Sequence, residues 1–231
     1  MPELVLLRHG QSQWNLENRF TGWWDVNLSD KGVEEAREAG RALKEAGFQF
    51  DIAYTSVLTR AIKTLNLAIE EMGQLWLPMI KAWELNERHY GGLTGYNKKE
   101  MAEKVGDDQV FIWRRSFDIP PPDMEKGSEF DVSTDARYAQ IDASLIPQTE
   151  SLKDTIERVL PYWNTEIAPA LQNGKRLIIA AHGNSLRALV KYLDGISDDD
   201  IPTVEIPTGK PLVYKLDASL KPIECYYLHE R

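Results

Sequence analysis

The sequence has a single cysteine, Cys225, so the chain has no partner for an intramolecular disulfide and no set of thiolates for a metal ion. Histidine is also scarce, and the four residues (His9, His89, His182 and His229) lack the spacing of metal ligands on a helix. Cys225 lies in an apolar stretch near the end of the chain, where we expect it to pack rather than to react. We therefore expect no metal in the functional site.

The chain has fewer basic than acidic residues, and it has no long hydrophobic run. The chain has 27 Lys and Arg against 36 Asp and Glu, which gives a formal net charge of −9. This balance argues against nucleic acid or an anionic membrane as the main partner, and no apolar stretch approaches the length of a membrane span. Met1-Pro2-Glu3 does not begin a signal peptide, so we expect a cytoplasmic protein. An anionic ligand would need a local cluster of basic residues.

Several common catalytic signatures are missing. The chain contains no glycine-rich Walker loop and no Gly-x-Gly-x-x-Gly dinucleotide motif. A Gly-x-Ser-x-Gly nucleophile elbow is missing as well, which disfavours a serine hydrolase. The site must therefore be sought among other residues.

Strand and helix patterns alternate along the chain, which predicts an α/β fold with a mainly parallel central sheet and helices on both faces. We expect a first helix capped by Ser29 and ended by Gly47. Further expected strands cover residues 3–7, 51–56, 77–82, 177–181, 212–216 and 223–228, and further helices cover 57–72, 98–105, 107–117, 150–160 and 185–193. The length fits one domain, residues 1–231. Residues 8–27 are expected to be a loop, and residues 118–148 form an irregular insertion that is either a lid or a solvated surface segment.

Two apolar strand patterns run directly into His-Gly. One precedes Arg8-His9-Gly10, and the other precedes His182-Gly183. In open parallel sheets, ligands bind at the carboxyl ends of the strands. If both patterns are strands of one sheet, the two imidazoles lie at the same functional edge.

Histidine beside arginine suggests phosphoryl chemistry. A neutral imidazole can attack phosphorus and carry the phosphoryl group covalently. Arg8 and Arg60 would lower the pKa of His9, bind phosphate oxygens and stabilise the transferring charge. A lone histidine after a strand is more often structural, but two matching His-Gly turns with nearby arginines favour the catalytic interpretation.

Four segments resemble the histidine phosphatase superfamily, and among its members the cofactor-dependent phosphoglycerate mutases. These segments are Arg8-His9-Gly10-Gln11-Ser12-Gln13-Trp14-Asn15, Phe20-Thr21-Gly22-Trp23, Leu85-Asn86-Glu87-Arg88-His89-Tyr90-Gly91 and Ala180-Ala181-His182-Gly183-Asn184-Ser185-Leu186-Arg187. The resemblance covers nearly the whole chain. It implies interconversion of 2-phosphoglycerate and 3-phosphoglycerate, with 2,3-bisphosphoglycerate as primer and intermediate and no metal. It also implies a homodimer or homotetramer.

The resemblance implies a role for each matching residue. His9 would carry the phosphoryl group, Glu87 would take and return the proton of the substrate hydroxyl, and His182 would stabilise the transferring charge. The catalytic set is then His9, Glu87, His182, Arg8 and Arg60. The substrate-binding set is Arg8, Ser12, Asn15, Thr21, Gly22, Arg60, Glu87, Arg88, Tyr90, Lys98, Arg114, Arg115, Gly183 and Asn184.

Less specific interpretations remain open at this point. Arg114 and Arg115 could lie on a solvated helix face, and Glu87 could be the partner of a nearby arginine. Trp14, Trp23 and Trp24 are expected to pack beneath the first loop. A histidine phosphatase, a bisphosphoglycerate synthase or a non-catalytic binder of phosphometabolites could use the same residues. Such mutases usually continue past the final strand into a tail thought to cover the site, whereas this chain ends at Leu228-His229-Glu230-Arg231. We therefore expect a less covered site, which admits water more readily, and some hydrolysis of phospho-His9.

Overall fold

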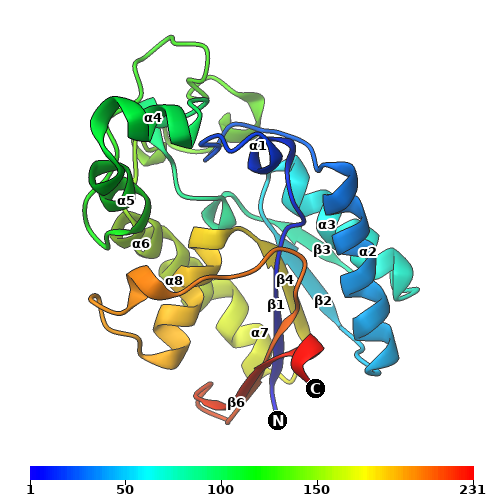
Figure 1. Ribbon diagram of the computed structural model, residues 1–231. Helices are drawn as coiled ribbons and strands as arrows, with labels where there is room; N and C mark the ends of the chain where they lie inside the picture. Colours follow the sequence, from blue (N-terminus) through cyan, green and yellow to red (C-terminus); the bar gives the residue numbers. More distant parts are fainter.

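A six-stranded sheet forms the centre of the computed structural model, which describes residues 1–231 (Figure 1). The strand order is β3-β2-β4-β1-β5-β6. The strands are β1 (Glu3–Arg8), β2 (Ile52–Thr55), β3 (Met79–Lys81), β4 (Leu177–Ala181), β5 (Leu212–Leu216) and β6 (Pro222–Tyr227). The first four strands are parallel, while β5 is antiparallel to β1 and β6 is antiparallel to β5. The predicted α/β class with a mainly parallel sheet is confirmed.

Side chains alternate between the two faces of the sheet and thereby form two cores. In β1, Leu4 and Leu6 join one core, whereas Val5 and Leu7 join the other. Each of these four side chains is fully buried. The continuous apolar runs of the sequence follow from this arrangement, because a strand covered on both faces has no solvent side.

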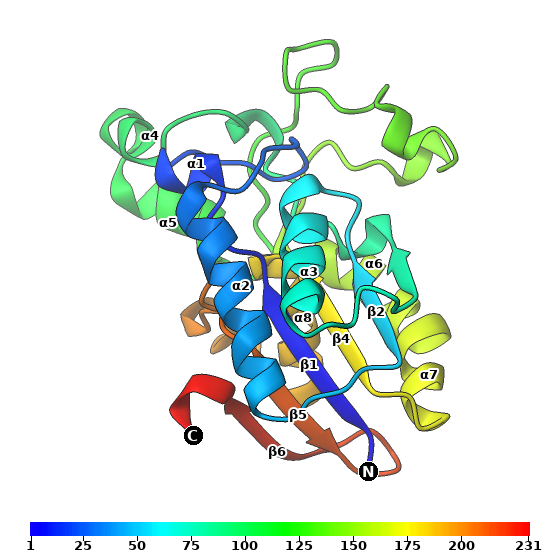
Figure 2. The same cartoon turned by 90° about the vertical axis from the view of Figure 1, so that its right-hand side faces the viewer.

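Helices cover both faces (Figures 1 and 2). The helices of the chain are α1 (Gln13–Leu16), α2 (Asp30–Glu45), α3 (Thr59–Glu71), α4 (Lys98–Val105), α5 (Asp107–Arg115), α6 (Leu152–Tyr162), α7 (Ala168–Gln172) and α8 (Gly183–Asp194). Helices α2 and α3 share a core with one face of the sheet, and α6, α7 and α8 share a core with the other. Ser29 caps α2 as expected, since its hydroxyl accepts a hydrogen bond from the Gly32 amide at 3.1 Å.

The carboxyl ends of the parallel strands point toward α1, α4, α5 and the irregular segment (Figures 1 and 2). Residues 118–148 contain only two short 3-10 turns, Ala136–Tyr138 and Ala143–Leu145. Part of this segment is buried, because Val132 and Tyr138 pack in one cluster with Trp23. The segment thus lies over the first loop on the same side of the sheet as the two His-Gly turns.

Three local expectations need correction. The predicted loop 8–27 contains the short helix α1, which Ser12 caps through the backbone amide of Asn15. The helix expected to reach residue 160, where Pro161 would bend or restart it, continues through Pro161 to Tyr162 and leads into α7 through a π-helical turn, Trp163–Ile167. Cys225 does not pack in the core: it is exposed, because β6 is an edge strand.

The chain has no helix that is long and apolar enough to cross a membrane. No three His, Cys, Asp or Glu side chains are grouped so that they could hold a metal ion.

Candidate active site

Two cavities lie at the carboxyl edge of the sheet. The inner cavity has a volume of about 50 Å³ and is lined by Arg8, His9, Asn15, Arg19, Phe20, Thr21, Gly22, Arg60, Glu87, Tyr90 and Lys98. The outer cavity has a volume of about 240 Å³ and is lined by Arg8, Glu87, Tyr90, Lys98, Arg114, Arg115, Gly183, Asn184, Arg187, Val204, Glu205 and Ile206. Four residues line both cavities, so the two form one continuous site.

His9 follows β1 and lies at the inner cavity. Its Nδ1 is 2.6 Å from the carbonyl oxygen of Gly10. A carbonyl can only accept, so Nδ1 carries the proton and donates it, which leaves the lone pair on Nε2. Burial, together with the positive charges of Arg60 and Arg8, holds the pKa of His9 well below its usual value. The imidazole is therefore neutral at pH 7 and has a free nucleophilic nitrogen. The predicted effect of the arginines on this pKa is confirmed in direction, but burial is the larger cause.

The turn after His9 is held by close backbone packing. The Gly10 amide donates to the hydroxyl of Thr64 at 3.0 Å. A Cβ atom on Gly10 would lie 2.1 Å from the carbonyl oxygen of Gly32, in the first turn of α2. Only glycine permits this approach, and the contact fixes His9 relative to α2 and α3.

His182 follows β4, the neighbour of β1, and its ring lies at the edge of the His9 ring with 5.0 Å between the centroids. The two histidines therefore meet as the strand pattern predicted. His182 is fully buried, and its Nε2 lies 2.8 Å from the hydroxyl oxygen of Ser56. Its Nδ1 has no hydrogen-bond partner within the protein. Burial, with the charge of Arg60 next in size, also holds the pKa of His182 well below its usual value.

Arg60 and Arg8 provide fixed positive charge beside His9. The buried guanidinium of Arg60 donates to the carbonyl oxygens of Gly22 at 2.7 Å and Trp24 at 3.1 Å. Burial lowers the pKa of Arg60 to about 10, so the group stays cationic at pH 7. Arg8 donates to the carbonyl oxygen of Ile206 at 2.7 Å, and its Nε has no partner.

Glu87 lies where the two cavities meet, and its position is set by backbone groups. Its Oε1 accepts from the amides of Arg88 at 2.8 Å and Asn184 at 3.0 Å. No protein donor contacts Oε2, and Glu87 takes part in no ion pair. The interpretation of Glu87 as the partner of an arginine is therefore wrong in this structure, and Oε2 is free to exchange a proton with a ligand.

A buried ion pair organises the loop that carries Glu87. Arg158 on α6 pairs with Glu150 at 2.7 Å, and both side chains are less than a tenth exposed. The same guanidinium donates to the carbonyl oxygens of Glu84 at 2.6 Å, Asn86 at 3.1 Å and Glu87 at 2.8 Å. Each of these bonds is charge-assisted, so Arg158 fixes the course of the loop from α6.

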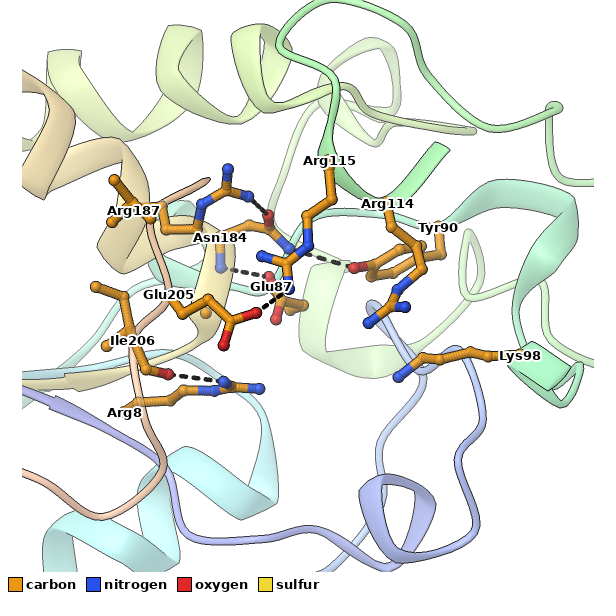
Figure 3. A pocket seen from close by; sticks show the side chains of 12 residues that line it. Arg8, Glu87, Tyr90, Lys98, Arg114, Arg115, Asn184, Arg187, Glu205 and Ile206 are labelled. Carbon is orange, nitrogen blue, oxygen red and sulfur yellow. Dashed lines mark hydrogen bonds and ion pairs between the residues drawn. The ribbon is translucent and has the colours of Figure 1, made fainter. Parts of the chain in front are cut away.

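Positive charge dominates the outer cavity (Figure 3). Arg114 and Arg115, from the last turn of α5, line the wall, and Lys98 lies next to Arg114. Burial lowers the pKa of Lys98. The interpretation of the arginine pair as a solvated helix face is therefore wrong. Across the two cavities the cations are Arg8, Arg19, Arg60, Lys98, Arg114, Arg115 and Arg187, and the carboxylates are Glu87 and Glu205.

Two residues predicted to bind substrate line neither cavity. The hydroxyl of Ser12 accepts from the Asn15 amide and so caps α1. The guanidinium of Arg88 is buried, donates to the carbonyl oxygens of Trp113 at 2.9 Å and Arg114 at 3.1 Å, and stacks on Tyr90. Both residues therefore support the walls of the site. The other predicted binding residues line one cavity or both.

Several residues of the site and its support could not be predicted from the sequence, among them four charged ones. Arg187 was overlooked although it lies three residues after Asn184 on the same face of α8 and donates to its side-chain oxygen at 2.9 Å. Arg19 lies within the first loop, where its charge was the only signal. Arg158 and Glu205 reach the site from distant segments, and no local motif marks them.

Comparison with known proteins identifies relatives of this chain. The histidine phosphatase superfamily (branch 1) matches residues 4–134. Proteins named "2,3-bisphosphoglycerate-dependent phosphoglycerate mutase" are 65% identical over 231 residues in Zymomonas mobilis and 64% identical over 230 residues in Erythrobacter litoralis, in each case covering 100% of both chains. A protein of that name from Pasteurella multocida is 60% identical over 226 residues, which are 98% of this chain and 100% of that one.

Solved structures share the fold at low sequence identity. A phosphoglycerate mutase from Bacillus anthracis superposes with a TM-score of 0.70 at 23% identity, covering 97% of this chain and 92% of that one. A mycobacterial glucosyl-3-phosphoglycerate phosphatase superposes with a TM-score of 0.72 at 20% identity, covering 98% and 97%. The chain belongs to the histidine phosphatase superfamily and, within it, to the family of the 2,3-bisphosphoglycerate-dependent phosphoglycerate mutases.

Proposed function

We propose that this chain interconverts 2-phosphoglycerate and 3-phosphoglycerate, a step of glycolysis and gluconeogenesis, through a phosphohistidine on His9. The observation that carries the proposal is the hydrogen bond from His9 Nδ1 to the Gly10 carbonyl, which leaves Nε2 free beside Arg8 and Arg60. The names of the full-length relatives support the same reaction. A phosphatase or bisphosphoglycerate synthase has no comparable support, and a non-catalytic binder needs neither a free nucleophile nor an acid.

Each of these residues has its own role in phosphoryl or proton transfer. His9 Nε2 forms a bond to phosphorus as the phosphorus–oxygen bond of the donor breaks, and Arg8 and Arg60 bind the phosphoryl oxygens. In the reverse direction the substrate hydroxyl attacks phospho-His9, and Glu87 Oε2 takes the hydroxyl proton. Glu87 returns that proton when the other phosphate is transferred to His9. His182 stabilises the transferring charge from the edge of the His9 ring.

The site suits 2,3-bisphosphoglycerate as primer. This molecule carries two phosphates and a carboxylate, roughly −4 to −5 in charge at neutral pH. Seven cationic side chains line the two cavities, against two carboxylates. When bound, the primer supplies the phosphoryl group that loads His9, while Lys98, Arg114, Arg115 and Arg187 hold the rest of the molecule in the outer cavity.

A primer-dependence assay tests the proposal. The chain is given 3-phosphoglycerate with and without trace 2,3-bisphosphoglycerate, in EDTA, and 2-phosphoglycerate and inorganic phosphate are both followed. We expect 2-phosphoglycerate to form only with primer and despite the chelator, and His9→Gln to abolish it. Release of inorganic phosphate without isomerisation would instead identify a phosphatase.

We further propose that residues 1–231 act as one cytoplasmic catalytic domain without nucleic acid or membrane partners, and that the chain forms a homodimer or homotetramer. The exposed edge of the sheet supports self-association: Leu75, Trp76 and Ile80 flank or lie on β3, and Trp76 is 69% exposed. Light scattering on the wild type and on Trp76→Glu tests this. A monomeric wild type would contradict the proposal.

A further inference from the structure

A carboxylate stands in the wall of the outer cavity, where the proposed ligands are strongly anionic. Glu205 lies in the connection between the 3-10 turn Ile201–Thr203 and β5, and it forms an ion pair with Arg115 (Figure 3). Glu205 lines only the outer cavity, whereas His9 lines the inner one. The proposed chemistry leaves Glu205 without a role, since Glu87 already serves as acid and base.

The backbone around Glu205 is fastened to the site on both sides. The carbonyl oxygen of Ile201 accepts from Arg187 at 2.6 Å, and that of Ile206 accepts from Arg8 at 2.7 Å. The Gly209 amide donates back to the Arg8 carbonyl at 3.0 Å. Ile206 is 3% exposed and belongs to one of the two cores. This anchored backbone places Glu205 at the mouth of the cavity, where its side chain is 73% exposed and Arg115 is its ion-pair partner.

The carboxylate acts on ligands in two ways. It satisfies Arg115, so an incoming anion must compete for that guanidinium, and its charge repels the anion directly. The direct repulsion grows with the total charge of the ligand, whereas the competition depends on the ligand group that reaches Arg115 in the outer cavity. A monophosphoglycerate carries roughly −2.5 to −3 and a bisphosphoglycerate roughly −4 to −5. Glu205 therefore weakens the binding of the bisphosphorylated molecule more than that of the monophosphorylated one.

We infer that Glu205 is a specificity-determining residue that sets, through Arg115, the balance between monophosphoglycerate and bisphosphoglycerate binding in the outer cavity. The inference rests on the proposed function, because it takes these two molecules as the ligands. Its consequence is that the primer, although more highly charged, does not exclude the monophosphorylated substrate from the site.

Binding measurements on a chain that cannot transfer the phosphoryl group test the inference. In a His9→Asn background, dissociation constants for 3-phosphoglycerate and 2,3-bisphosphoglycerate are measured by calorimetry with and without Glu205→Gln. We expect the change to tighten 3-phosphoglycerate binding about 3-fold and 2,3-bisphosphoglycerate binding about 6-fold, as charge scaling requires. Raising the salt concentration should shrink both gains.

Two matched variants complete the design. Glu38→Gln makes the same charge change on an exposed part of α2 and should leave both constants unchanged. In an Arg115→Gln background, Glu205→Gln should change the ratio of the two constants less than about 1.5-fold. Equal tightening of both ligands, or none, would overturn the inference while leaving the proposed function intact. Failure of both ligands to bind any variant would overturn both.

Discussion

The hydroxyl oxygen of Ser56 lies 2.8 Å from Nε2 of His182, with both side chains fully buried. The same oxygen accepts a hydrogen bond from the Leu58 amide at 3.1 Å. The Ser56 hydroxyl therefore still has its own proton to donate, and His182 Nε2 is the acceptor within hydrogen-bond distance. The proton of the neutral imidazole then belongs on Nδ1, which has no partner within the protein. Ser56 thus selects the His182 tautomer that carries its proton on Nδ1.

Replacing Ser56 with Ala should remove this selection. We expect kcat for the mutase reaction to fall about 10- to 100-fold with little change in KM, since the affected contact forms as charge transfers. Nitrogen NMR of His182 should show protonation divided between the two ring nitrogens. Ser56→Thr should restore most of the rate.

The neighbouring residue provides a control for Ser56. Thr55 is equally buried, but its hydroxyl has no hydrogen-bond partner. Thr55→Val should therefore leave kcat and the His182 tautomer unchanged. If Ser56→Ala had no larger effect than Thr55→Val, Ser56 would not be a positioning residue.

The stability of the fold should decrease as pH falls below neutrality. Burial lowers the pKa of His89 from 6.5 to about 4, although the charges of Glu150 and Asp131 oppose this shift. Between pH 6.5 and about pH 4 the unfolded chain binds a proton at this residue that the folded chain does not bind. The free energy of unfolding therefore decreases as the pH is lowered, by up to about 1.4 kcal/mol per pH unit for this group. His9 and His182 add to the slope, since their pKa values are lowered as well.

Urea unfolding at several values between pH 7 and pH 5 measures this slope. His89→Gln should reduce it by up to about 1.4 kcal/mol per pH unit, the share of one proton, with the largest reduction near pH 5. His229→Gln, at an exposed position on the C-terminal turn, serves as the control and should leave the slope as in the wild type. A slope that is the same in all three proteins would contradict the assignment of His89 as a buried neutral group.

Arg158 should support both stability and the position of Glu87. Lysine keeps the charge but cannot reach Glu150 and three carbonyl oxygens at once. We expect Arg158→Lys to lower the free energy of unfolding by about 3 kcal/mol. We also expect kcat to fall more than KM rises, because the loop carrying the proton acceptor loosens. Glu157→Gln, an exposed neighbour on α6, should change neither quantity. Loss of stability with an unchanged kcat would show that Arg158 does not position Glu87.

The main parts of the site could be predicted from the sequence because they depend on local patterns. His9 and His182 each follow an apolar strand, and the pairing of Arg8 with Ala181 places the two turns side by side. Burial of the strands on both faces and the capping of α2 by Ser29 could be inferred in the same way. These features need only the sequence neighbourhood of each residue.

Features that depend on distant contacts could not be predicted. Arg88 was expected to bind substrate, but carbonyl groups of α5, about 25 residues later in the chain, satisfy it inside the protein. Cys225 lies in an apolar stretch, yet its strand is the last in the sheet and leaves it exposed. Glu205 lines the outer cavity from a segment that Arg8 and Arg187 hold through the carbonyl oxygens of Ile206 and Ile201.

The central claim is that His9 carries the phosphoryl group, and mass spectrometry of the protein and of its peptides tests it most directly. The chain is incubated with 2,3-bisphosphoglycerate, quenched at alkaline pH to preserve phosphohistidine, and its peptides are mapped. We predict one acid-labile phosphoryl group per chain, on the peptide containing His9, discharged by added 3-phosphoglycerate and missing from His9→Gln. A phosphoryl group on another residue, or its retention in His9→Gln, would contradict the account.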